Sequence, residues 1–168
     1  MEIVKYPSPV LKKKCSPVLG ITSETKGLIK NMVDMMRASN GLGLAANQIG
    51  HPVRILVISL PEKDGKPSEL VLINPTILQK RGKIFEEEGC LSFPGFYTKI
   101  KRHKKVVVSA INERGKTVEI MVEDLLSRVI QHEIDHLNGI SFVQRLPFLQ
   151  RIKTLLDIHR RIKKGTWS

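Results

Sequence analysis

The stretch Gln131-His132-Glu133-Ile134-Asp135-His136 decides the fold and chemistry expected of this chain. It lies in a segment of helical period that starts at Glu123 and ends at Asn138-Gly139, with its apolar side formed by Leu125, Leu126, Val129 and Ile130. Residues four apart project from one face of a helix, so His132 and His136 can bind one metal ion. Glu133 is then placed to take a proton from a water molecule that the metal activates. The segment predicts a metal-binding helix with hydrolytic chemistry.

The same pattern also occurs by chance on charged surface helices, so a third metal ligand has to be found. One peptidase pattern requires a third His at a position where this chain has Phe142. Another takes a Glu from a later helix, but no Glu follows Glu133. Only Asp157 and His159 remain there, in a strongly basic segment. Asp157 is better explained as a member of a surface ion pair, and His159 as a residue on the face of a helix. The known peptidase patterns therefore supply no convincing third ligand.

A better candidate lies upstream, in Glu88-Gly89-Cys90-Leu91-Ser92. This segment places a cysteine beside a glycine at the end of a predicted strand. A thiolate suits Zn or Fe(II), and one Cys with two His leaves a position open for water. The other cysteine, Cys15, is expected to be a small buried apolar residue. Cys90 is thus the predicted third ligand.

Around these segments the chain predicts an α+β fold in a single domain, residues 1–168. An N-terminal helix is expected over 23–38, with Ser23 as its cap. A C-terminal helix is expected from Pro147 to Lys164, with Leu149, Ile152, Leu156 and His159 on one face. Strands are expected over 53–59, 70–74, 77–81, 84–88, 105–111 and 117–122. We therefore expect an antiparallel or mixed sheet packed around a central metal-binding helix, with helices at both ends of the chain.

Composition limits the remaining possibilities. The net charge of +12 and pI near 9.9 favour proximity to polyanions, although only 5% of residues are aromatic. The longest apolar runs, such as 55–58, are strand-sized, no signal peptide is evident, and two cysteines cannot form a disulfide framework. These features predict a cytoplasmic protein with no membrane contact. No nucleotide cofactor is expected either. The glycines of 41–46 fit a dinucleotide-binding pattern, but they follow a helix where that pattern requires a strand. Gly115-Lys116-Thr117 resembles the end of a phosphate-binding loop, but it lies in a predicted hairpin.

Three segments resemble, in order and spacing, the signature motifs of the peptide deformylases. They are Gly41-Leu42-Gly43-Leu44-Ala45-Ala46-Asn47-Gln48, Glu88-Gly89-Cys90-Leu91-Ser92 and Gln131-His132-Glu133-Ile134-Asp135-His136-Leu137-Asn138-Gly139. The resemblance implies removal of the formyl group from the N-terminal formylmethionine of nascent polypeptides, with release of formate. It implies Fe2+ as the native metal, with Zn2+ or another divalent ion as an alternative.

The resemblance also implies roles for individual residues. The metal ligands are Cys90, His132 and His136, and the general acid and base is Glu133. Gln48 and the backbone N–H of Leu91 stabilise the oxyanion. The implied substrate contacts are Leu42, Gly43 and Gly89.

Some further expectations surround this site. Val129 is a candidate for lining an apolar methionine pocket, and Glu88 is expected to pair with Arg102. Asn47, Glu86 and Arg128 depart from residues common at these positions in the family. The basic face of the C-terminal helix is a possible ribosome contact, formed by Arg151, Lys153, Arg160, Arg161, Lys163 and Lys164. Two other functions stay open, a zinc endopeptidase using Asp157 or His159 and a basic RNA-binding module.

Overall fold

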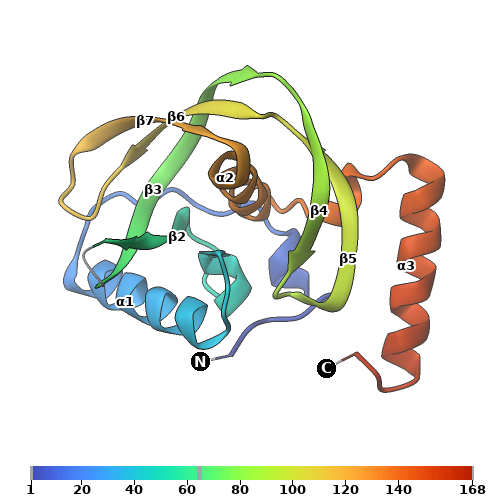
Figure 1. Ribbon diagram of the computed structural model, residues 1–168. Coiled ribbons are helices and arrows are strands. Elements are labelled where there is room, and N and C mark those ends of the chain that lie inside the picture. The colour runs from blue at the N-terminus through green and yellow to red at the C-terminus, as the bar shows by residue number, and fades with distance from the viewer. Residues whose placement is uncertain (1, 64–65, 168) are drawn as a thin grey trace.

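Helix α2 (Asp124–Leu137), which carries the HExxH segment, lies at the centre of the molecule with strands around it (Figure 1). This arrangement is seen in a computed structural model that describes residues 2–63 and 66–167. Helix α1 (Ser23–Ala38) and helix α3 (Phe148–Lys163) lie on opposite sides of the molecule. The predicted α+β fold, with a sheet around a central helix, is confirmed.

The larger sheet has five strands in the order β1-β2-β3-β6-β7, and each neighbouring pair is antiparallel. Its strands are β1 (Gly43–Ala45), β2 (Ile55–Lys63), β3 (Lys66–Arg81), β6 (Lys105–Ile111) and β7 (Thr117–Glu123). Strands β4 (Ile84–Cys90) and β5 (Phe93–Arg102) form a separate antiparallel pair. The segments with the predicted metal ligands therefore lie on β4 and α2, while the glycine motif includes β1.

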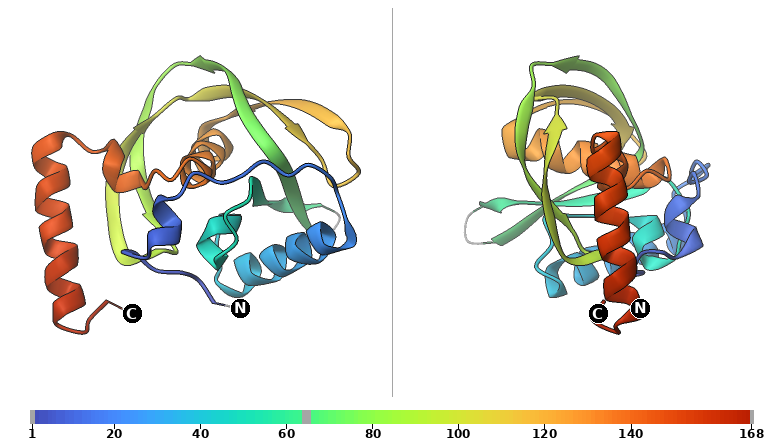
Figure 2. Two further views of the ribbon diagram at one scale, coloured as in Figure 1. Left: turned by 180° about the vertical axis from the view of Figure 1, so that it is seen from behind. Right: turned by 90° about the vertical axis from the view of Figure 1, so that its right-hand side faces the viewer.

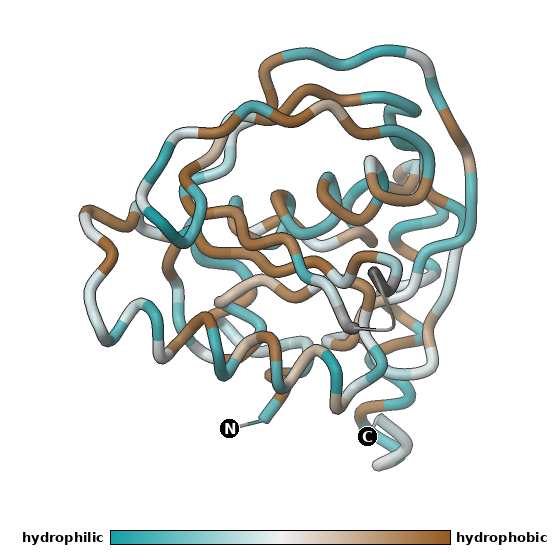
Figure 3. Tube along the Cα trace, turned by 60° about the vertical axis from the view of Figure 1, so that its left-hand side comes forward, coloured by the Kyte–Doolittle hydropathy of each residue, from teal (hydrophilic) through white to brown (hydrophobic). Residues whose placement is uncertain are grey.

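Strand β2 shows how the core is divided. Successive side chains of a strand point to opposite faces, and both faces of β2 are buried. Leu56 and Ile58 pack in a cluster with α2, whereas Ile55 and Val57 pack in a second cluster with α1. Figure 3 shows the resulting apolar segments in the interior and the hydrophilic turns outside. A strand segment buried on both faces is continuously apolar, as Ile55-Leu56-Val57-Ile58 at the start of β2 is.

Four details differ from the sequence prediction. The side chain of Thr22, rather than Ser23, caps α1 by accepting a hydrogen bond from the Thr25 N–H at 3.2 Å. The strands expected over 70–74 and 77–81 form one strand, β3, with a register shift near Asn74, whose φ is +53°. Strands β1 and β5 lie in segments for which the sequence pattern predicts no strand.

The packing of α3 also corrects the prediction. The buried residues of α3 are Thr154 and Ile158, whereas Leu149, Ile152 and Leu156 are exposed. Figure 2 shows that α3 lies at the edge of the molecule, where its inner side meets a third apolar cluster that includes Phe93 and Phe142. No helix in the described part of the chain is long and apolar enough to cross a membrane.

Candidate active site

Three side chains from the two signature segments on β4 and α2 converge at one point. The ligand atoms of Cys90, His132 and His136 all lie within 4.8 Å of one another. The Sγ atom of Cys90 is 3.1 Å from Nε2 of His136. One thiolate and two imidazoles form a donor set that suits Zn or Fe(II). The structure therefore brings together the three residues predicted as ligands.

A buried carboxylate oxygen beside this cluster lacks a partner and fits a site that takes another molecule. Nδ1 of His136 and Oε2 of Glu133 are buried, and neither has a hydrogen-bond partner among the described residues. Buried polar atoms are normally hydrogen-bonded, so an unpaired carboxylate oxygen marks a place where another molecule is expected. Burial raises the pKa of Glu133 to about 7. A carboxyl group with that pKa can accept and return a proton near neutral pH.

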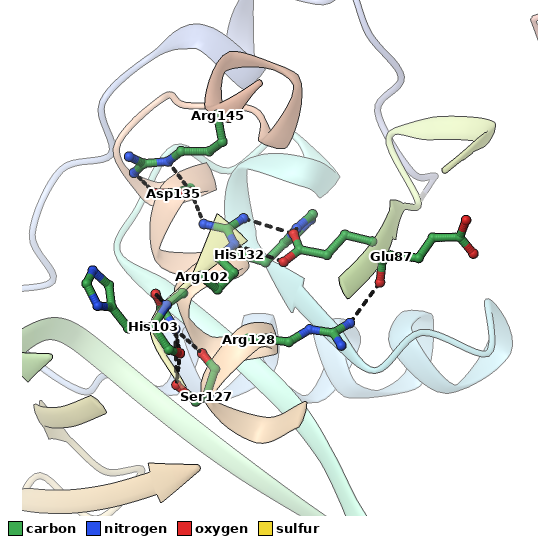
Figure 4. Close-up of polar contacts among 10 residues, drawn as sticks. Glu87, Arg102, His103, Ser127, Arg128, His132, Asp135 and Arg145 are labelled. Carbon is green, nitrogen blue, oxygen red and sulfur yellow. Dashed lines mark hydrogen bonds and ion pairs between the residues drawn. The ribbon is translucent and has the colours of Figure 1, made fainter. Parts of the chain in front are cut away.

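Behind the cluster, a chain of buried charges fixes the orientation of His132 (Figure 4). Nδ1 of His132 lies 3.1 Å from Oε2 of Glu88, which leaves Nε2 for the cluster with Cys90 and His136. Arg102 donates two hydrogen bonds to Glu88, at 2.9 and 3.0 Å, as the predicted ion pair requires. Asp135 accepts hydrogen bonds from both Arg102 and Arg145. A histidine held in this way has one tautomer and one ring orientation.

The charge of Glu88 is maintained in spite of its burial. Although burial alone raises the pKa of Glu88, hydrogen bonds from His132 and Arg102 lower it to about 2. Glu88 therefore stays ionised and can hold the imidazole of His132 at neutral pH. When a metal-binding imidazole donates its other ring N–H to a carboxylate, the nitrogen that binds the metal becomes more basic.

Gln48 and Asn47 connect the first motif to the cluster. Gln48 accepts a hydrogen bond from the N–H of Ala45 through Oε1 at 2.9 Å, which turns its amide nitrogen toward Cys90. That nitrogen lies 3.2 Å from the Ser92 hydroxyl and 3.5 Å from the Cys90 sulfur. Asn47 donates to the backbone oxygen of His136 at 2.7 Å. The motif thus contacts both segments that supply the predicted ligands.

Two glycines of the motifs permit close approach. A Cβ on Gly43 would lie 2.8 Å from both Oε1 of Glu133 and Cγ1 of Val129, so only glycine lets β1 approach α2 this closely. A Cβ on Gly89 would lie 2.4 Å from the ring of Tyr97, which packs directly on the strand backbone. Both positions therefore need glycine because of space at the site.

The site opens into a cavity of about 400 Å³. Most of the predicted site residues line it: Leu42, Gly43, Gln48, Gly89, Cys90, Leu91, His132 and Glu133. Val129 lines it as well, as expected for a candidate pocket residue. The alternative ligands lie elsewhere, because Asp157 pairs with Arg161 at 2.9 Å and His159 bonds the Leu155 oxygen at 2.7 Å. The site thus has the parts of a hydrolytic centre next to a space for substrate.

Comparison with known proteins agrees with this geometry. A family model described as polypeptide deformylase matches residues 1–152. This chain belongs to the peptide deformylase family. The peptide deformylase of Aquifex aeolicus is 47% identical over 163 residues, which cover 96% of each chain. That of Thermodesulfovibrio yellowstonii is 44% identical and covers 90% of this chain and 92% of its own.

Solved deformylase structures share the fold. The peptide deformylase from Legionella pneumophila superposes with a TM-score of 0.88 at 36% identity, covering 99% of this chain and 98% of its own. The one from Thermus thermophilus gives a TM-score of 0.87 at 36% identity, covering 98% of this chain and 96% of its own. The motifs that suggested a deformylase therefore lie in a chain with the deformylase architecture.

Three residues of this deformylase site were not singled out by their chemistry in the sequence. Asp135 lies inside the third motif, and its place three residues after His132 was the available signal. Arg145 reaches Asp135 from a 3-10 helix beyond α2, and no local pattern indicates that contact. Tyr97 lies on the unpredicted strand β5 and lines the cavity.

Proposed function

We propose that this protein hydrolyses the formyl amide of N-terminal formylmethionine on newly made polypeptides and releases formate. The observation that carries the proposal is one cavity in which Cys90, His132 and Glu133 meet beside His136. Family membership over 152 residues supports the same reaction. Such substrates arise at the ribosome, so we place the enzyme's work in the cytoplasm.

We assign the metal to Cys90, His132 and His136, whose donor atoms suit a divalent ion. A metal bound there supplies Lewis-acid activation of a water molecule and of the formyl carbonyl. Glu133 takes the proton from the attacking water as the new C–O bond forms. It then gives that proton to the amine nitrogen as the C–N bond breaks, so formate and a free N-terminus leave.

We assign oxyanion stabilisation to Gln48 Nε2 and to the backbone N–H of Leu91. Gln48 is held by Ala45 so that its amide N–H groups face the Cys90 side of the cavity, and Leu91 follows Cys90 directly. Donors that are already oriented stabilise developing negative charge without reorganising. The extended substrate backbone is assigned to Leu42, Gly43 and Gly89, which line the same cavity.

A substrate comparison tests this function. We expect hydrolysis of formyl-Met peptides, little action on acetyl-Met analogues because the added methyl group crowds the site, and no internal cleavage of an unblocked protein. Released formate and new N-termini are both measured. Efficient internal cleavage would mean that the protein is an endopeptidase.

We propose Fe2+ as the native metal, on the basis of the donor set and the family resemblance; Zn2+ is the alternative. Protein prepared without oxygen should contain iron and lose activity on exposure to peroxide, because a thiolate and Fe(II) are both oxidisable. Metal analysis and activity before and after peroxide provide the test. An iron-loaded sample that resists peroxide fully would count against iron.

We also propose that the basic face of α3 contacts the ribosome. Lys153, Arg160, Lys163 and Lys164 are exposed on this helix. RNA binding through such a face weakens as salt rises. Because α3 packs on the core through Ile158, truncation would disturb the fold, and charge reversal of the four residues is the better test. Reversal of the exposed Arg114 and Lys116 is the matched control, and co-sedimentation with ribosomes is the measurement.

A further inference from the structure

Arg128 occupies an unusual place in the cavity. Residues Leu125, Arg128, Val129 and His132 line it from one face of α2, as the spacing of three and four residues requires. Arg128 is the only lysine or arginine among the described residues that line the cavity. One helical turn, a rise of about 6 Å, separates it from His132. Its backbone therefore lies about 6 Å along the helix from that of a predicted metal ligand, a separation close to the length of an extended methionine side chain.

The guanidinium of Arg128 bridges two walls of the cavity. Its Nη2 donates to the backbone oxygen of Glu87 on β4 at 2.8 Å, across the space between helix and strand (Figure 4). Its Nε is buried and has no hydrogen-bond partner among the described residues. A ligand cannot reach the buried Nε, but Nη1 of the same guanidinium is not among the buried atoms and forms no hydrogen bond with the described residues. Nη1 can therefore donate to an acceptor that a ligand brings into the cavity, and a hydrogen bond to a charged donor is stronger than one to a neutral donor.

The neighbours of Arg128 define the shape of that ligand. Leu42, Leu125 and Val129 line the same cavity and supply apolar contacts for a hydrocarbon stem. The acceptor should therefore stand at the end of an unbranched apolar chain. A thioether sulfur is only a weak acceptor, whereas a sulfoxide oxygen on the same chain is a strong one.

We propose that Arg128 is a specificity-determining residue that donates a hydrogen bond to the tip of the first side chain of the substrate. The favoured class comprises formyl peptides whose first residue is unbranched and ends in an acceptor, with oxidised methionine, the sulfoxide, as its strongest member. The proposal rests on the proposed deformylase function. It adds damaged N-termini to the substrates of the enzyme.

The test compares three tripeptides that differ only in the first residue: formyl-norleucine, formyl-methionine and formyl-methionine sulfoxide. Metal-loaded wild-type enzyme is compared with Arg128→Leu, Arg128→Met and, as a control, Arg114→Leu in the exposed turn between β6 and β7. The readout is the ratio of kcat/KM for the sulfoxide to that for norleucine. A ratio is independent of the fraction of enzyme that is folded and active.

We expect this ratio to fall by about tenfold or more in both Arg128 variants, the size expected for a hydrogen bond to a charged donor, and mainly through KM. The Arg114 variant should keep the wild-type ratio. Equal ratios in wild type and both Arg128 variants, with all formyl peptides hydrolysed, would overturn this inference alone. A loss confined to Arg128→Leu would overturn it too, because cavity volume would then be the cause. Failure to hydrolyse any formyl peptide would overturn the proposed function and this inference with it.

Discussion

Helices α2 and α3 are both amphipathic, but they use their polar and apolar residues in opposite ways. The buried residues of α2 include Gln131, His132, Glu133, Asp135 and His136. Helix α3 buries only Thr154 and Ile158 and leaves Leu149, Ile152 and Leu156 exposed. Burying polar groups is unfavourable unless each has a partner, whereas an exposed apolar side chain is common on protein surfaces. The buried polar residues of α2 therefore indicate a functional site. The exposed apolar residues of α3 do not by themselves indicate another.

The partners of the buried polar residues on α2 explain how the helix stays stable. Gln131 bonds the backbone of His103 through both its amide atoms, and Asp135 accepts from Arg102 and Arg145. Three buried side-chain atoms on this helix lack a partner among the described residues: Glu133 Oε2, His136 Nδ1 and Arg128 Nε. His136 belongs to the proposed metal site, and Glu133 and Arg128 line the cavity beside it. The comparison of the two helices can be tested by removing these groups in turn.

Removal of a ligand should have the largest effect. We expect Cys90→Ala to lose metal and activity together, because two imidazoles alone make an incomplete site. Metal content by elemental analysis and the rate on a formyl-Met peptide are the measurements. Cys15→Ala is the matched control: Cys15 is buried and burial raises its pKa to about 11, so it is no thiolate near neutral pH. Retention of stoichiometric metal in Cys90→Ala would reopen the choice of third ligand.

Replacement of Glu133 should separate metal binding from chemistry. Glu133→Gln keeps the size of the side chain but cannot carry the proton from water to amine. We expect a near-normal metal content and a fall in turnover of about a hundredfold to ten-thousandfold. The comparison with His132→Ala, prepared anaerobically in the same way, should show metal loss only in the latter. If Glu133→Gln turned over at nearly the wild-type rate, another group would have to carry the proton.

The same contrast explains what the sequence could and could not predict. The pair His132 and His136 follows from the geometry of one helix, and Cys90 was indicated by its place beside Gly89 at the end of a predicted strand and by the resemblance to the deformylase motifs. Strand β5 escaped prediction because Pro94-Gly95 reads as a turn and Lys99 and Lys101 dilute the apolar pattern, whereas pairing with β4 makes it a strand. The break expected between 74 and 77 came from Asn74-Pro75, which the sheet accommodates as a register shift. Local patterns cannot show such tertiary pairing.

Weakening the buried charge chain should have an intermediate effect. Asp135→Asn removes the charge that holds Arg102, which in turn holds Glu88 against His132. Loss of such support typically weakens metal affinity by about 10–100-fold, and we expect a value in that range. Competition with a chelator measures it on protein shown to be folded by circular dichroism. Glu123→Gln, which removes an exposed partner of Lys105, should leave the affinity unchanged.

The smallest effects are expected on α3, where one substitution on its buried side and one on its exposed side can be compared. Ile158 is completely buried beside Phe93 and Phe142, whereas Leu149 is 74% exposed. Truncating Ile158 to Ala leaves a cavity and removes apolar contact, so the free energy of unfolding should fall by about 2–4 kcal/mol. Truncating Leu149 to Ala removes little contact and should change it by no more than about 0.5 kcal/mol.

Urea unfolding of the two metal-loaded variants measures both values under one condition, which matters because bound metal itself stabilises the folded state. Equal losses would mean that Leu149 is covered by a part of the structure or a second molecule in solution. The expected difference would instead show that α3 is held by its inner side alone. Its apolar outer residues would then contribute little to the fold, in contrast to the buried polar residues of α2, each of which has a partner or a proposed task.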